Sequence, residues 1–151
     1  MSITAKDSAV INYPIEDVYR TLTDFHSYPR WYPKPFKIEV LHLDSHAIGT
    51  TISIENGKLV KWTAKISDFE PNKLIAIDYI EGAWLGKTFW KFEGSNRKTK
   101  LTMEIDLEIN SSWLRQLSKV MNFSKVHSKQ MGQVFAALEV YMGKKEKIGE
   151  L

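Results

Sequence analysis

Three polar side chains, Ser124, His127 and Ser128, interrupt an otherwise apolar stripe in the C-terminal part of the sequence. An imidazole titrates near neutral pH, so a histidine here could hydrogen-bond a bound molecule or transfer a proton to it. A histidine whose ring is satisfied by the neighbouring hydroxyls or by a strand carbonyl would explain the same pattern without any ligand. Which interpretation holds depends on whether the rest of the chain builds a cavity opposite His127.

The segment that carries these residues, 110–147, is predicted to form one long helix. Asn110 or Ser111 is the expected N-cap, because their side chains can accept hydrogen bonds from the first free amides of a helix. At about 100° per residue, large apolar side chains recur on one stripe. They are Trp113, Leu117, Val120, Met121, Met131, Phe135, Leu138 and Met142. A stripe that is apolar at both ends and polar in the middle indicates a core that is not completely filled.

The preceding residues predict a strand at 3–12, a first short helix beginning at Pro14, and a second near 26–31. Six strands with period-two alternation follow, and Asn56-Gly57 is a strong hairpin signal between two of them. Connections of hairpin length make the sheet antiparallel. Only the long helix has an apolar stripe that could cover it. We therefore expect an α+β fold in which a seven-stranded, curved antiparallel sheet wraps around the long C-terminal helix.

The strand alternation places several large side chains on the face of the sheet that turns toward this helix. Tyr79 adds a phenol that could orient the polar end of a ligand. The connection at 83–85 is apolar, so we expect Trp84 to tuck inward or to guard an opening. The residues predicted to line a ligand cavity are Trp62, Tyr79, Trp84, Trp90, Met103, Ser124, His127, Ser128, Met131 and Phe135. Ordinary core packing is the competing interpretation for the apolar members of this set.

Composition narrows the possible functions. The 151 residues fit a single domain, 1–151, and contain no cysteine, which excludes disulfides, thiolate nucleophiles and cysteine metal ligands. The histidines lie on different predicted elements without the spacing of metal ligands, so no metal site and no cofactor is predicted. They are His26, His42, His46 and His127. No motif identifies a catalytic residue, and none is assigned.

The formal charge of +3 is modest and the basic residues are mixed with acidic ones, which argues against nucleic acid as a partner. No apolar run approaches the roughly 18 residues that a membrane-spanning helix needs. We expect a soluble cytoplasmic protein, a monomer or weak dimer, without stable membrane insertion. High aromatic content suits both a well-packed core and the walls of an apolar ligand cavity.

The order of elements and two segments resemble the START-like (SRPBCC) superfamily, in particular its polyketide cyclase/dehydrase branch. The segments are Pro-Ile-Glu-Asp-Val-Tyr at 14–19 and Tyr-Pro-Arg-Trp-Tyr-Pro at 28–33, the latter preceded by Leu-Thr-Asp at 22–24. The resemblance covers essentially the whole chain and implies a helix-grip fold with a deep apolar cavity between sheet and terminal helix. Quinone-binding members carry a Pro-Trp-Cys step, whereas this chain has Trp-Tyr-Pro at 31–33 and no cysteine, which argues against a quinone.

The superfamily includes carriers, cyclases and co-chaperone activators, so three hypotheses follow. The first is binding or transport of a small apolar or amphipathic molecule, lipid-like or polycyclic, oriented by His127, Ser124 or Tyr79. The second is a polyketide cyclase/dehydratase-like enzyme with His127 as proton shuttle. It ranks lower, because general acid–base catalysis needs a positioned partner and the predicted inward positions include no carboxylate. The third is a protein-interaction module of the co-chaperone activator type, with the cavity packed shut by Trp62, Trp90 and Phe135.

Overall fold

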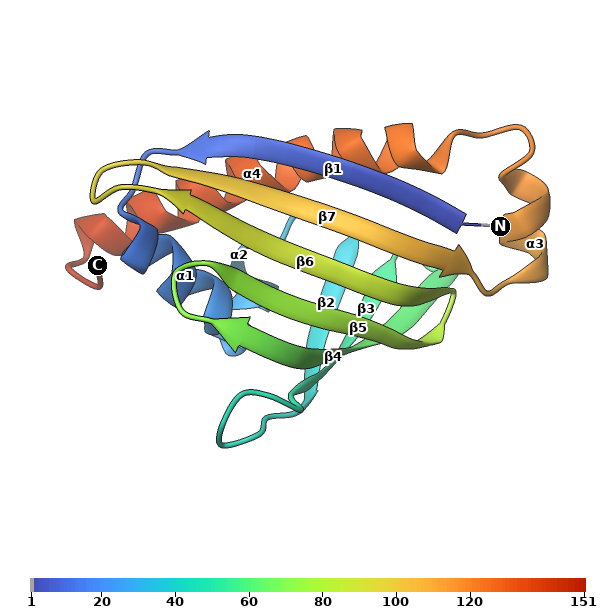
Figure 1. Ribbon diagram of the computed structural model, residues 1–151, viewed down its shortest axis with the longest axis horizontal. Coiled ribbons are helices and arrows are strands. Elements are labelled where there is room, and N and C mark those ends of the chain that lie inside the picture. Colours follow the sequence, from blue (N-terminus) through green and yellow to red (C-terminus); the bar gives the residue numbers. More distant parts are fainter. Residues whose placement is uncertain (1) are drawn as a thin grey trace.

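Seven strands form one antiparallel sheet in the order β1-β7-β6-β5-β4-β3-β2 (Figure 1), in a computed structural model that describes residues 2–151. The strands are β1 (Ser2–Ile11), β2 (Phe36–His42), β3 (Thr51–Asn56), β4 (Val60–Glu70), β5 (Leu74–Gly82), β6 (Trp84–Gly94) and β7 (Thr99–Ile109). The helices are α1 (Ile15–Thr23), η1 (Phe25–Ser27), α2 (Tyr28–Trp31), α3 (Ser112–Leu117) and α4 (Phe123–Lys147). This arrangement confirms the predicted α+β helix-grip fold.

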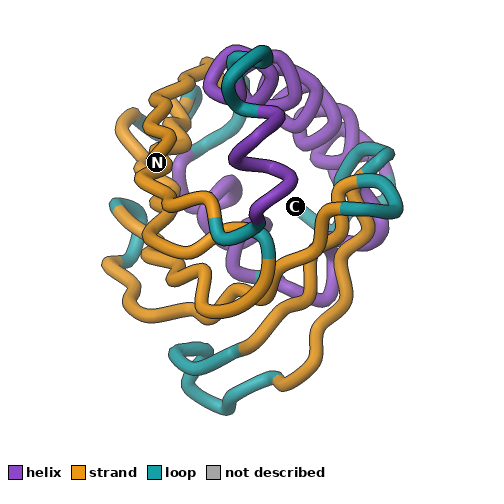
Figure 2. The backbone as a smooth tube through the Cα atoms, turned by 90° about the vertical axis from the view of Figure 1, so that its right-hand side faces the viewer, coloured by secondary structure: helices purple, strands orange, loops and turns teal. Residues whose placement is uncertain are grey.

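The sheet curves around α4, as the view along the long axis shows (Figure 2). Strands β2 to β7 lie side by side in chain order, and β1 pairs with β7 to complete the arc. Pairing of β4 with β5 is irregular between Thr63 and Ala64 and again between Ile66 and Asp68. Irregularities of this kind bend a strand and increase its twist, which helps the sheet to curl.

Helix α4 runs beside the edge strand β1 and is joined to it near both ends of the strand. The Ser124 hydroxyl donates to the Thr4 carbonyl oxygen at 2.9 Å. Further along, the Asn12 side-chain amide donates to the Glu139 carboxylate at 2.9 Å. These contacts fix the direction in which α4 crosses the sheet and therefore which of its side chains face inward.

The single helix predicted over 110–147 is wrong, because residues 118–122 separate α3 from α4. Asn122 begins α4, its side chain accepting a hydrogen bond from the Lys125 amide at 3.1 Å. The expected cap Ser111 does precede α3, but its side chain makes no capping hydrogen bond. Val120, placed on the buried stripe by helical phase, is instead 83% exposed. After the break the stripe is as predicted, with Met131 and the later apolar positions buried.

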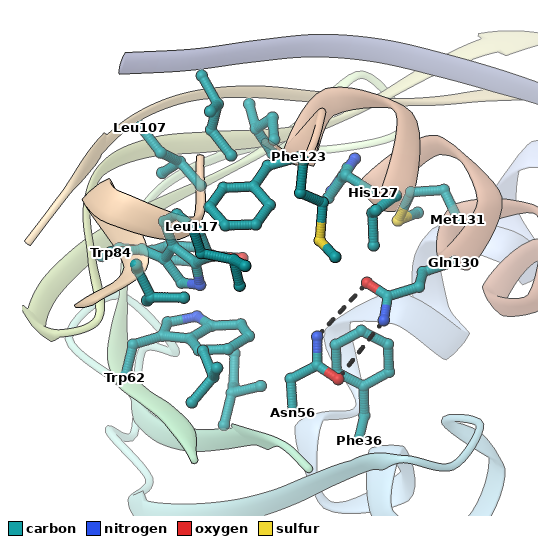
Figure 3. A pocket seen from close by; sticks show the side chains of 18 of the residues that line it. Phe36, Asn56, Trp62, Trp84, Leu107, Leu117, Phe123, His127, Gln130 and Met131 are labelled. Carbon is teal, nitrogen blue, oxygen red and sulfur yellow. Dashed lines mark hydrogen bonds between the residues drawn. The ribbon is translucent and has the colours of Figure 1, made fainter. Parts of the chain in front are cut away.

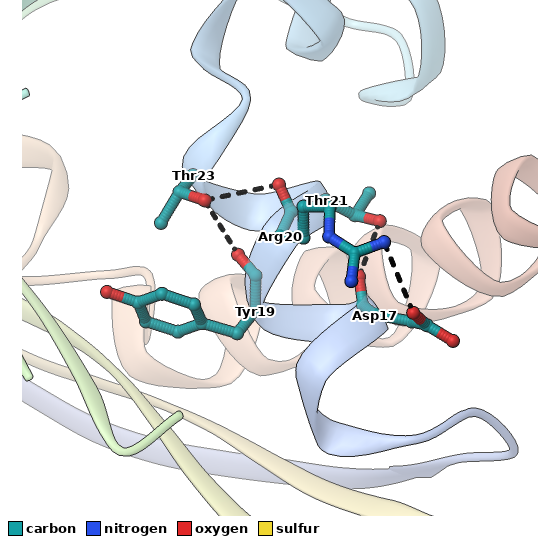
Figure 4. Close-up of polar contacts among 5 residues, drawn as sticks. All are labelled: Asp17, Tyr19, Arg20, Thr21 and Thr23. Carbon is teal, nitrogen blue, oxygen red and sulfur yellow. Dashed lines mark hydrogen bonds and ion pairs between the residues drawn. The ribbon is translucent and has the colours of Figure 1, made fainter. Parts of the chain in front are cut away.

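The end of the grip away from α3 is closed by α1, which packs on β6. The Tyr19 ring meets Phe92 edge to face, with centroids 5.3 Å apart. Polar contacts within the helix stabilise its turns (Figure 4): the Thr21 hydroxyl donates to the Asp17 carbonyl at 2.8 Å, and the Arg20 guanidinium lies 3.5 Å from the Asp17 carboxylate. This part of the grip keeps only a small void of about 40 Å³ beside Phe25, Tyr28 and Trp90, so the larger space lies toward α3.

Helix α3 belongs to a hydrophobic cluster separate from the main core. The buried members of this small cluster are Ala83, Ile109 and Leu114. Partly buried Trp84 packs against it and meets Phe123 edge to face, with centroids 5.7 Å apart. Trp84 is the first residue of β6, so the predicted apolar loop at 83–85 is nearly absent. The Trp84 side chain is therefore held by a strand and not by a mobile lid.

Candidate functional site

A cavity of about 240 Å³ lies between the sheet and the region where α3 is followed by α4 (Figure 3). Its walls come from the inner faces of β1 and β3 to β7, from Tyr32 and Phe36, from α3 and from the first turns of α4, and they are mostly apolar. The lining residues are Ile3, Tyr32, Phe36, Ile54, Asn56, Val60, Trp62, Tyr79, Trp84, Met103, Ile105, Leu107, Trp113, Leu114, Leu117, Met121, Phe123, Val126, His127, Gln130 and Met131. An apolar concavity with a few polar side chains is the usual form of a small-molecule site.

The structure brings part of the predicted site together around this cavity. The predicted residues that line it are Trp62, Tyr79, Trp84, Met103, His127 and Met131. Strand alternation directs the sheet residues inward, and helical phase within α4 does the same for His127 and Met131. Opposite His127, the Trp62 and Tyr79 rings lie with centroids 5.6 Å apart.

Four predicted residues lie outside the cavity lining. Trp90 and Phe135 are buried against each other further along the grip, with ring centroids 6.3 Å apart, and belong to the filled core. Ser124 faces β1, where its hydroxyl is used by the Thr4 carbonyl. Ser128 is exposed. Both serines lie within α4 and keep their phase relative to Met131, but the stripe faces the edge strand β1 at Ser124, and Ser128 lies at its exposed border.

An amide pair that was not predicted from the sequence lies at the edge of the cavity. The Asn56 side-chain nitrogen donates to Gln130 Oε1 at 3.4 Å, and the Gln130 nitrogen donates to Asn56 Oδ1 at 3.5 Å (Figure 3). The pair joins the β3–β4 hairpin to α4. Both distances are long, so these hydrogen bonds are weak. Asn56 was recognised only as a turn residue, and no local pattern links it to Gln130.

Asp7 on β1 lies beside His127. The Asp7 Oδ2 and His127 Nδ1 atoms are 3.4 Å apart, and within residues 2–151 neither atom has a hydrogen bond of good geometry to any other group. The alternation of β1 turns residues 3, 5, 7, 9 and 11 inward, so an aspartate occupies an otherwise apolar face. This corrects the expectation that no carboxylate accompanies the histidine. The signal was present in the sequence as a charged residue in inward register.

Burial lowers the pKa of His127 below its ordinary value, and the nearby Asp7 carboxylate opposes part of that shift by raising it. The imidazole is therefore neutral at pH 7 and able to accept a proton or hydrogen bond. With Nδ1 directed at Asp7, Nε2 is the remaining nitrogen of the imidazole. A carboxylate at Nδ1 favours the tautomer that leaves Nε2 free to accept.

Lowering the pH from 7 to 5 is expected to destabilise the protein through His127. Because its pKa is lower in the folded state, the unfolded chain takes up a proton there first. The stabilising contribution is complete above the ordinary value of 6.5 and is lost as the pH falls through that value toward the folded pKa. Urea unfolding at pH 7, 6 and 5 should show this loss. His127→Gln should reduce this pH-dependent loss of stability. If the difference in stability between the variant and the unmodified protein is the same at all three pH values, His127 is not the group responsible.

Two further polar groups face the cavity from the sheet. The Trp62 Nε1 atom is buried and has no hydrogen-bond partner among the residues that the structure describes. Burial raises the pKa of the Tyr79 phenol, which therefore stays protonated, and the neighbouring Thr88 and Trp62 side chains oppose part of that shift. Figure 3 places Trp62 and His127 on opposite sides of the cavity. A bound molecule can thus be held by polar groups at both ends and by apolar contact in between.

Across residues 2–151, His, Asp and Glu side chains are nowhere grouped in threes that could hold a metal ion. Asp7 and His127 alone would supply too few ligands for a protein metal centre. None of the helices described is long and apolar enough to cross a membrane.

Comparisons with known proteins agree with this geometry. A model of the family described as polyketide cyclase/dehydrase and lipid transport matches residues 11–128. No curated protein sequence matches the chain. Similar solved structures include the Zhui aromatase/cyclase from Streptomyces sp. R1128, with 16% identity, 96% of each chain covered and a TM-score of 0.74. A START superfamily protein from Mycobacterium smegmatis has 16% identity and a TM-score of 0.73, and the match covers 96% of this chain and 98% of that protein's chain. Norcoclaurine synthase from Thalictrum flavum has 9% identity and a TM-score of 0.69, and the match covers 95% of this chain and 88% of the synthase chain.

Proposed function

The chain belongs to the polyketide cyclase/dehydrase and lipid transport family, and we propose that it binds one small, largely apolar molecule in the cavity beside His127. The observation that carries this proposal is an apolar cavity in which buried polar groups lack partners. Trp62 Nε1 is such a group on the sheet side, and His127 Nδ1, beside the Asp7 carboxylate, is such a group on the helix side. Unpaired buried polar groups cost free energy, and a ligand that pairs with them recovers it.

The cavity favours a compact ligand. Its volume of about 240 Å³ lies slightly below the roughly 300–1,000 Å³ typical of drug-sized ligand pockets. Aromatic side chains on several walls suit a flat ring system or a short branched chain better than a long acyl chain. The indole N–H of Trp62 calls for an acceptor oxygen at one end of the ligand. The neutral imidazole of His127 calls for a hydroxyl at the other.

Native mass spectrometry of the purified protein, followed by solvent extraction and identification of the released compound, tests this proposal. The expected result is one bound molecule per chain, small and mostly apolar, with at least one hydroxyl or carbonyl oxygen. Titration of the emptied protein with a panel of hydroxylated mono- and polycyclic compounds is the second arm. A protein that carries nothing and binds no member of the panel would contradict the proposal.

The Asp7–His127 pair favours a second candidate, an enzyme that moves a proton on the bound molecule. His127 Nε2 would take a proton from a weakly acidic O–H or C–H group of the ligand, and the Asp7 carboxylate would stabilise the imidazolium that forms. Return of the proton to another ligand atom completes an isomerisation without any co-reactant. Turnover lost in Asp7→Asn while ligand affinity is retained would support catalysis over simple binding.

The third hypothesis, a protein-interaction module with a closed cavity, receives no support. It required Trp62, Trp90 and Phe135 to fill the space between sheet and helix. Trp90 and Phe135 do pack together, but Trp62 borders an open cavity. Ligand binding therefore remains the function that this geometry favours.

A further inference from the structure

The junction of α3 and α4 exposes a group of large apolar side chains at the cavity entrance. Trp113 is 46% exposed, Val120 83%, Met121 43% and Val126 39%. We refer to these four residues as the mouth patch. Trp113, Met121 and Val126 also line the cavity, so the patch is continuous with its interior. A protein in water gains nothing by exposing such side chains together, and an apolar patch of this kind marks an interaction surface.

The charged side chains of the segment that carries the mouth patch have one sign. From residue 109 to residue 138 the sequence contains no aspartate or glutamate, whereas it contains Arg115, Lys119, Lys125 and Lys129. All four basic side chains are exposed, and none forms an ion pair within the part of the chain that the structure describes. On the neighbouring hairpin the carboxylate of Glu55 lies 3.6 Å from Lys61 and is neutralised by it.

We propose that the mouth patch docks on the surface of an anionic lipid bilayer. Apolar side chains with tryptophan among them enter the boundary between headgroups and acyl chains, and unpaired cations beside them are attracted to anionic headgroups. Such a surface needs no matching shape. A protein partner would pair its charges with those of the patch across a complementary surface. Scattered unpaired lysines and an exposed Val120 are therefore better explained by a bilayer than by a protein partner.

Docking in this orientation places the cavity entrance against the membrane. A poorly water-soluble ligand could then pass between bilayer and cavity without crossing water. The attachment is peripheral, because no described helix could span the bilayer. Each basic residue near an anionic surface raises the partition coefficient roughly fivefold, so the four together bind reversibly and in a salt-dependent manner.

Co-sedimentation with vesicles tests the proposal without requiring any ligand. The full-length protein is mixed with vesicles of phosphatidylcholine alone or of phosphatidylcholine with phosphatidylglycerol, at low and high salt. We expect binding to the anionic vesicles only, lost at high salt. Lys119→Glu with Lys125→Glu should weaken binding roughly 25-fold or more, taking about fivefold for each basic residue removed. Val120→Glu should also weaken it, because a carboxylate would replace an inserted apolar side chain.

Matched control substitutions lie near the other end of α4. Val140 is 60% exposed, so Val140→Glu makes the same chemical change about 21 Å along the helix from position 126. Lys144→Glu with Lys145→Glu makes the same charge reversal at the C-terminal end. Both controls should fold, as judged by circular dichroism, and Val140→Glu should bind vesicles like the unmodified protein. The lysine control should lose clearly less affinity than the pair at the mouth.

Three results of the vesicle assay would overturn the proposal. They are no binding to anionic vesicles at low salt, unchanged binding of the mouth variants, or equal losses in the control variants. A self-association that Val120→Glu abolishes in the absence of vesicles would instead make the patch an interface between two copies of the chain, and would also overturn it. Failure of vesicle binding with ligand binding intact would leave the proposed function standing, because the two are measured separately.

Discussion

Met131→Trp is expected to lower the affinity for an amphipathic aromatic fluorescent probe, such as 1-anilinonaphthalene-8-sulfonate, by roughly tenfold or more, equivalent to about 1.4 kcal/mol. Met131 is buried and lines the cavity, so the larger indole extends into space that the ligand would occupy. The extra volume meets a void instead of packed side chains. The free energy of unfolding should therefore change by less than about 1 kcal/mol.

Met142→Trp is the matched control. Met142 is also a buried methionine of α4, but it does not line the cavity. Inserting an indole into packed core should cost roughly 1–3 kcal/mol of stability and leave probe affinity unchanged. Fluorescence titration and urea unfolding of both variants measure the two quantities. Unaltered probe binding by a folded Met131→Trp protein would show that the probe binds elsewhere.

Trp90→Ala is expected to cause the largest loss of stability, about 3–5 kcal/mol, which is the usual range for removing a fully buried large aromatic side chain. Trp90 is almost completely buried and packs edge to face against Phe135. It ties β6 to α4 in the filled part of the grip. Trp90 does not line the ligand cavity but borders the small void next to it, so probe affinity measured well below the melting temperature should change less than in a variant of a lining residue.

Trp84→Ala should give the opposite pattern. Trp84 is only partly buried and lines the cavity next to Phe123. Its truncation should cost less stability than that of Trp90 and should weaken probe binding. Urea unfolding and probe titration of the two variants form a test of where the core ends and the site begins. Equal losses of stability and affinity in both proteins would contradict the separation of these regions.

The sheet could be predicted because its signals are local. Alternation along β4 directs Trp62, Ala64 and Ile66 inward, and all three are buried as expected. A hairpin signal such as Asn56-Gly57 also fixes which strands are neighbours. Once seven such strands carry one apolar face, only a long amphipathic helix can cover it. The fold class therefore followed from patterns that each span fewer than about ten residues.

The details of the site were less accessible because they depend on distant contacts. His127 and Asp7 meet only after an N-terminal edge strand and the C-terminal helix lie side by side. The break at 118–122 was missed because Val120 and Met121 happen to continue the helical period across it. Asn122, a good cap residue, was the local signal for a new helix start. Ser124 and Ser128 lie outside the cavity for a different reason: the α4 stripe faces the edge strand β1 at Ser124, and Ser128 lies at its exposed border.

The small cluster of Ala83, Ile109 and Leu114 has a consequence for how the protein responds to heat and to selection. Because α3 rests on this cluster and not on the main core, it can detach at a free-energy cost below that of global unfolding. Amide hydrogens of α3 should then exchange through local opening, while those of β7 exchange only with the whole molecule. Substitutions on α3 can likewise accumulate without threatening the fold. The entrance is thus the part of this molecule in which a new ligand preference can evolve at least risk.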